Sequence, residues 1–192
     1  CQRLEKMGFE VTYLPVDETG KISLSDLSEA LREDTILVSI MYGNNEVGTI
    51  QPIKEIGELL SSHQAVFHTD AVQAYGIEEI NVNDLHVDLL SVSAHKINGP
   101  KGTGFLYVRD KVKLVPRAYG GEQERKRRAG TENVAAIVGF QEAVKVANED
   151  MLIKQESYQG FKKTFIEHLT EHSIDFSING LLENSLPHVL NL

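Results

Sequence analysis

The sequence contains a single cysteine, Cys1, and it lacks long apolar runs. One cysteine excludes an internal disulfide and a cysteine metal cluster. No apolar run approaches the ~20 residues that a membrane-spanning helix needs, and the first residues lack the basic region and apolar core of a signal peptide. Basic residues number 19 against 28 acidic ones, and the formal charge of −9 argues against non-specific nucleic-acid binding. We therefore expect a cytoplasmic protein that contacts neither nucleic acid nor membrane directly.

The composition is that of an ordinary globular protein, with 41% hydrophobic and 24% charged residues. The 192 residues suit one domain, or one domain and part of another. Residues 1–7 have the pattern of an amphipathic helix without an N-cap, and residues 189–192 resemble the start of a strand. Both ends thus fall inside expected elements, and we expect the chain to be the middle of a longer protein.

Apolar runs and amphipathic segments alternate along the first part of the chain. We expect strands at 9–14, 35–41, 65–69, 87–92 and 105–108, and helices at 23–32, 53–61 and 133–148. Such alternation predicts an α/β domain with a mostly parallel sheet flanked by helices. The run at 35–41 is continuously apolar, which is typical of a strand buried on both faces.

The pattern changes near residue 150. Helical spacing continues less cleanly over 151–168, and residues 173–178 and 187–192 look like strands of a new unit. We therefore divide the chain into a large domain, residues 1–150, and the beginning of a smaller α+β domain, residues 151–192.

The stretch from Ser93 to Gly104 combines a His-Lys pair with three glycines and a proline, directly after an apolar run. Lysine forms Schiff bases when burial or neighbouring positive charge lowers its pKa. A nucleotide-binding loop is the alternative, but the order G-x-x-x-x-G-K-[ST] is missing and a strand is expected to follow. We therefore take Lys96 as the candidate catalytic residue.

Polar side chains follow three of the expected strands. They are Asn44 and Asn45, then Asp70 and Gln73, then Ser93, His95 and Lys96. Ligands bind outside the carboxyl ends of strands in open parallel sheets, so these clusters are expected to meet in one crevice. A lysine that forms a Schiff base and an ionised aspartate facing a ring nitrogen fit a pyridoxal 5′-phosphate (PLP) site.

Several segments together resemble the cysteine desulfurases, which are fold-type I PLP-dependent enzymes of the class V aminotransferase superfamily. The resemblance covers essentially the whole chain, and the matching segments occur in the family's order: Asn44-Asn45-Glu46-Val47-Gly48, Phe67-His68-Thr69-Asp70-Ala71-Val72-Gln73, Ser93-Ala94-His95-Lys96, Gly99-Pro100-Lys101-Gly102 and Arg128-Ala129-Gly130-Thr131.

The resemblance implies a role for each site residue. Lys96 would hold PLP as a Schiff base and shuttle the substrate proton. Asp70 would pair with the pyridine nitrogen, and Gln73 would donate to the phenolic oxygen. Asn45 would contact the cofactor and the substrate carboxylate. Ser93 and His95 would bind the phosphate, and Thr131 would bind the phosphate of the partner protomer's cofactor.

The resemblance also implies a reaction and partners. A homodimer would convert L-cysteine to L-alanine and pass persulfide sulfur to an acceptor protein, either an iron–sulfur scaffold or a tRNA-thiolation enzyme. The family's sulfur-accepting cysteine belongs in a loop well after Thr131, and Cys1 is at the wrong end. We therefore expect these residues alone not to turn over cysteine.

Other functions stay open at this point. A selenocysteine lyase or another class V transferase would share these segments. A non-catalytic dimerisation or sulfur-transfer module is the alternative from another class, although such a module would not need Lys96, Asp70 and Gln73 together.

Each candidate also has a purely structural interpretation. Lys96 could be a surface lysine, Asp70 a helix cap, and Asn45 a turn former. Ser93 and His95 could be strand-end residues that satisfy backbone groups, and Thr131 could be the N-cap of a helix. The other histidines show no ligand spacing with carboxylates, so we expect no metal site: His63, His86, His168, His172 and His188.

Overall fold

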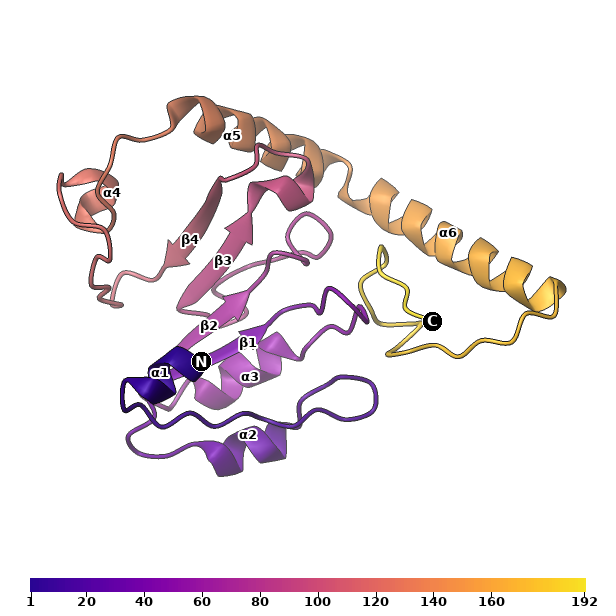
Figure 1. The fold of residues 1–192 in the computed structure, drawn as a ribbon, viewed down its shortest axis with the longest axis horizontal. Helices are drawn as coiled ribbons and strands as arrows, with labels where there is room; N and C mark the ends of the chain where they lie inside the picture. The colour runs from indigo at the N-terminus through magenta and orange to yellow at the C-terminus, as the bar shows by residue number, and fades with distance from the viewer.

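Four strands form one sheet at the centre of the computed structural model, which describes residues 1–192 (Figure 1). They are β1 (Leu37–Met41), β2 (Val66–Asp70), β3 (Leu89–Ser93) and β4 (Gly104–Val108), and they lie in the order β1-β2-β3-β4. The first three run parallel, and β4 is antiparallel to β3. The link 94–103 is too short for a parallel crossover, which needs about a dozen residues or more. The expected mostly parallel sheet is confirmed.

The helices have recognisable end signals. Ser23 caps α2 by accepting a hydrogen bond from the Asp26 amide at 3.2 Å, and Asn133 caps α5 through the Ala136 amide at 3.2 Å. Gly8, with φ +91°, follows the short first helix as a C′ glycine. The helices are α1 (Gln2–Lys6), α2 (Leu24–Ala30), α3 (Ile53–Leu60), the 3₁₀ helix η1 (Ala94–Ile97), α4 (Gln123–Lys126), α5 (Val134–Glu149) and α6 (Met151–Glu171).

The core lies on one face of the sheet. Phe67 and Leu90 point into it and pack with residues of α3 and α5, such as Ile56 and Phe140. Strand residues alternate between faces, and the opposite face of β1 is exposed at positions such as Ser39. The expectation that 35–41 is buried on both faces was therefore wrong, because other elements cover only one face of β1.

The expected strands at 9–14, 173–178 and 187–192 were also wrong. A strand needs a ladder of backbone partners, and these segments make only isolated contacts. The Asn179 amide donates to the Asn191 carbonyl at 3.0 Å, and the Leu186 amide donates to the Gly48 carbonyl at 2.7 Å. The apolar residues in these segments pack without forming a sheet.

Helices α5 and α6 form a bent arm across the top of the molecule, and the C-terminal segment folds back beneath α6 towards the sheet (Figure 1). Asp150 separates the two helices. The domain division near residue 150 falls at this break and stays a prediction. None of the helices combines the length and the apolar character required to cross a membrane.

Gly57 gives a stability prediction. A Cβ at this position in α3 would lie 2.1 Å from the Leu85 carbonyl oxygen, whereas a Cβ at Gly160 in α6 would meet nothing within 4 Å. We expect Gly57→Ala to lower the free energy of unfolding by about 1–3 kcal/mol through overpacking. Gly160→Ala should raise it by about 0.5–1 kcal/mol, because alanine is the better helix former. Urea titrations of both variants test this pair, and equal effects would contradict the packing at α3.

Candidate cofactor site

Three polar clusters meet at one edge of the sheet, because the strands that precede them are neighbours and run parallel. Asp70 is the last residue of β2, and its Cα pairs with Met41 of β1 and with Ser91 of β3. The Ala71 amide extends the ladder by donating to the Ser91 carbonyl at 3.0 Å. The turn that carries Asn45 follows β1 at this same edge. The structure therefore brings together six of the seven predicted site residues: Asn45, Asp70, Gln73, Ser93, His95 and Lys96.

Lys96 lies in η1, immediately after β3. Ala94 and Ile97 are buried on one side of this turn, and Lys96 is exposed on the other. Asn98 ends the turn in the left-handed region with φ 64°, and a Cβ on Gly99 would lie 2.9 Å from the Ala94 side chain. The close packing fixes the backbone, while no carboxylate forms a salt bridge with the Lys96 amine. The backbone of Lys96 is thus fixed at the sheet edge, and its exposed amine is available to a ligand.

Asp70 has one carboxylate oxygen occupied. Its Oδ1 accepts a hydrogen bond from the Val72 amide at 2.9 Å, which forms an Asx-turn, and no helix begins there. The helix-cap interpretation of Asp70 was therefore wrong. The second oxygen has no hydrogen-bond partner in the structure and is available to a ligand.

The turn after β1 contains two asparagines that differ in their hydrogen bonding. Asn44 Oδ1 accepts hydrogen bonds from the amides of Glu46 at 2.8 Å and Val47 at 3.0 Å. Asn44 therefore supplies the turn geometry, and the exposed side chain of Asn45 makes no hydrogen bond. The side chains of Ser93 and His95 are likewise unbonded, and Ser93 does not cap η1. The structural interpretations of these residues find no support in the hydrogen bonding.

Thr131 is apart from the other six residues. It lies in the segment between α4 and α5, and α4 stands well away from η1 at the left of Figure 1. The N-cap of α5 is Asn133, so the capping interpretation of Thr131 was wrong. The side chain of Thr131 is exposed and makes no hydrogen bond within this chain.

His68 is a residue at this edge that the sequence analysis did not single out. Its ring bridges two serines on neighbouring strands, with Nδ1 2.8 Å from Ser39 Oγ and Nε2 2.9 Å from Ser91 Oγ. Burial lowers the pKa of His68, although Asp70 acts in the opposite direction. A neutral ring can donate to one serine and accept from the other. The period-2 alternation of β2 places His68 and Asp70 on one face, and that signal could have identified it.

The exposed side chain of His188 lies beside this cluster, with its Nε2 3.4 Å from Gln73 Oε1. The two residues are 115 positions apart in the sequence, so no local pattern could predict the contact. Gln73 is thereby held from a distant part of the chain.

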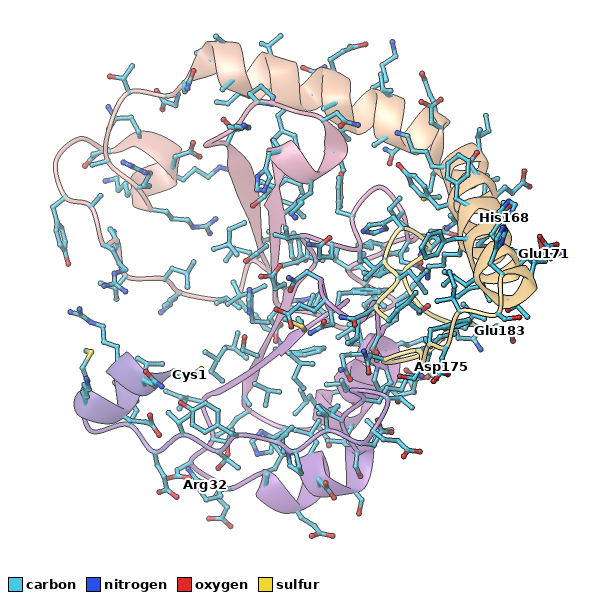
Figure 2. The ribbon with its side chains drawn as sticks, turned by 45° about the vertical axis from the view of Figure 1, so that its right-hand side comes forward. Cys1, Arg32, His168, Glu171, Asp175 and Glu183 are labelled. Atoms are coloured by element: carbon cyan, nitrogen blue, oxygen red, sulfur yellow. The ribbon has the colours of Figure 1, made fainter.

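A third histidine group contradicts the expectation that no histidine has ligand spacing. His168, Glu171 and His172 of α6 are three and four residues apart, and their ligand atoms lie within 4.8 Å of one another. Figure 2 shows His168 and Glu171 side by side near the end of α6. All three side chains are exposed, and the 3.5 Å approach of His168 to Glu171 is a surface pair of small energetic value.

A hollow of about 540 Å³ lies at the opposite edge of the sheet. Asp88 and Arg109, which line it, form a 3.3 Å ion pair. Asp88 also accepts from the Phe67 amide, and Arg109 donates to the Val87 carbonyl. Because these contacts hold the backbone together, the hollow is part of the scaffold and contains none of the candidate residues.

Comparisons with known proteins identify the family to which the chain belongs. The family model for class-V aminotransferases matches residues 1–185. A Bacillus subtilis protein whose name assigns it provisionally to the cysteine desulfurases IscS is 61% identical over all of this chain and 51% of its own length. The cysteine desulfurase IscS of Dictyoglomus turgidum is 48% identical over all of this chain and 48% of its own length. The chain thus spans about half the length of these relatives.

Solved structures show the same fold. A NifS-like protein superimposes with a TM-score of 0.92 at 39% identity, over 97% of this chain and 51% of that one. DndA from Streptomyces lividans gives a TM-score of 0.90 at 37% identity, over 98% and 54% of the two chains. The sheet and its helices have the architecture of the large domain of fold-type I PLP enzymes. The chain therefore belongs to the class-V aminotransferase family.

Proposed function

We propose that these residues form the cofactor-binding part of a PLP-dependent cysteine desulfurase, which converts L-cysteine to L-alanine and passes the sulfur on as a persulfide. The observation that carries the proposal is the edge at which Asp70, Gln73 and Lys96 meet. The names of the relatives give the substrate class. The same proposal places the protein in the cytoplasm as a homodimer, with residues 1–150 as the large domain and 151–192 as the start of the small one.

The chemistry of the donor set fits PLP. The cofactor needs an anion for its ring N–H, hydrogen-bond donors for its phosphate, and an amine for its aldehyde. The free oxygen of Asp70, the unbonded side chains of Ser93 and His95, and the amine of Lys96 match these needs. When bound, PLP withdraws electrons from the substrate Cα.

Each residue then has a distinct task. Lys96 Nζ holds the cofactor and afterwards moves a proton. The carboxylate of Asp70 keeps the ring nitrogen protonated, and Gln73 donates to the phenolic oxygen. Asn45 binds beside the substrate carboxylate. Thr131, which is remote from this edge, contributes to the phosphate site of the partner protomer.

Transfer of sulfur needs a thiolate. Cys1 is the only cysteine, and it lies on the side of the molecule away from α6 (Figure 2). We therefore propose that the 192 residues alone do not release alanine. In the full-length gene product, a cysteine thiolate would take the substrate sulfur and hand it to an acceptor protein for iron–sulfur assembly or tRNA thiolation.

The full-length gene product tests the proposal. We expect a yellow protein that releases one alanine for each cysteine consumed, measured by chromatography of the products. A matched reaction with selenocysteine serves as the control for substrate choice. Turnover of selenocysteine alone would favour a selenocysteine lyase. A colourless protein that turns over neither substrate would favour a non-catalytic binding module.

A further inference from the structure

The segment that carries His188 is fixed to the loop after β1. Leu186 is fully buried, and a Cβ at Gly43 would lie 2.7 Å from its side chain. The Leu186 amide donates a hydrogen bond to the Gly48 carbonyl at 2.7 Å, and Ser185 forms an isolated antiparallel β-bridge with Thr49. This segment is therefore held against the turn that presents Asn45.

Lys162 of α6 fixes the same segment from the other side. Only 9% of this lysine is exposed, and its Nζ donates to the Leu186 carbonyl at 2.7 Å and to Ser185 Oγ at 3.3 Å. A buried lysine that is fully engaged with a backbone carbonyl is a strong local anchor. His188 is two residues beyond this anchor, so its position is determined by the fold.

The contact with Gln73 places the amide oxygen towards His188, with Gln73 Oε1 3.4 Å from His188 Nε2. In this orientation Oε1 accepts a hydrogen bond from the His188 tautomer that carries its proton on Nε2. An amide held by its oxygen directs its NH₂ group to the other side. Without such a donor, the Gln73 amide could rotate by half a turn and present its oxygen instead.

The charges around His188 favour a neutral ring. Burial, followed by the positive charges of Lys162 and Lys96, lowers the pKa of His188. The ring of Tyr158 packs against it with centroids 6.0 Å apart. A neutral imidazole has one N–H, and the contact with Gln73 uses it on Nε2. The contact with Gln73 is what places His188 beside the candidate site.

From these contacts we propose that His188 is a positioning residue of the cofactor site. Its Nε2–H holds the Gln73 amide so that the NH₂ group faces the cofactor beside Lys96. This inference rests on the proposed function, since it assigns the direction of the hydrogen bond that Gln73 would donate to the phenolic oxygen of PLP.

The test is a pH titration of the visible absorbance of the PLP-loaded full-length protein. A donor to the phenolic oxygen draws negative charge away from the nitrogen that joins Lys96 to the cofactor, which favours loss of the proton from that nitrogen. We expect His188→Phe, which keeps a ring but has no donor, to move the transition to higher pH by about half to one unit, the size of one hydrogen bond. His188→Gln, which restores an N–H donor, should bring it back towards the wild-type value.

Gln73→Met and the double variant show whether His188 acts through Gln73. Gln73→Met should produce at least the same shift, and adding His188→Phe should not increase it. An unshifted transition in His188→Phe, or additive shifts in the double variant, would overturn the positioning role while leaving the PLP site intact. A wild-type protein without visible absorbance would instead contradict the proposed function.

Discussion

Replacing Lys96 with alanine should remove both the visible absorbance of the cofactor and the turnover of cysteine in the full-length protein. The amine both attaches the cofactor and moves the substrate proton, so the variant loses covalent attachment as well as acid–base catalysis. Acid–base catalysis alone is typically worth about 10²–10⁴-fold in rate. We therefore expect activity to fall by at least that factor, as measured by alanine release and by absorbance spectra of the dialysed protein.

Lys101 provides the matched control. It is an exposed lysine in the same glycine-rich turn, five positions after Lys96. Lys101→Ala removes an equal charge from the same surface and should keep both absorbance and activity. Retention of absorbance and activity in Lys96→Ala, or their loss in Lys101→Ala, would show that Lys96 is not the attachment site.

Asp70→Asn is expected to have the second largest effect. The asparagine oxygen can still accept from the Val72 amide, so the Asx-turn after β2 is preserved. The negative charge that stabilises the protonated ring nitrogen is lost. Removal of one preorganised electrostatic partner costs about 10²–10³-fold in rate. We expect a loss of this size in alanine release, while the protein stays yellow because Lys96 is unchanged.

Asp84→Asn separates this effect from a general change in charge. Asp84 is exposed and precedes β3, so it lies outside the cluster at the carboxyl edge. Its replacement should leave the rate within a factor of about two, since surface substitutions change little. An equal loss in both aspartate variants would mean that net charge, rather than contact with the ring nitrogen, determines the rate.

The sequence was sufficient for the sheet and for the edge at which the polar clusters meet. Apolar runs ending in polar clusters located β1, β2 and β3, and helical spacing located α2, α3 and α5 to within about two residues. Convergence of the clusters followed from the parallel direction of the strands. These features depend on local patterns and on one rule of sheet geometry, which is why they could be predicted.

Features that depend on tertiary contacts could not be predicted in the same way. The residues at 187–192 have a strand-like composition, but the fold offers Leu186 and its neighbours only isolated backbone partners. The approach of His188 to Gln73 joins residues from distant segments. Thr131 is the opposite case. Its segment follows the family's order in the sequence, but in the structure it lies apart from the six residues with which it was grouped.

Reduction of the full-length protein with borohydride, followed by proteolysis and mass spectrometry, tests the central claim most directly. Borohydride fixes a PLP Schiff base as a stable amine, so the labelled peptide identifies the lysine that holds the cofactor. We predict a single pyridoxyl group on Lys96. Labelling of another lysine, such as Lys101 or Lys162, or the absence of any label, would contradict the assignment of the site.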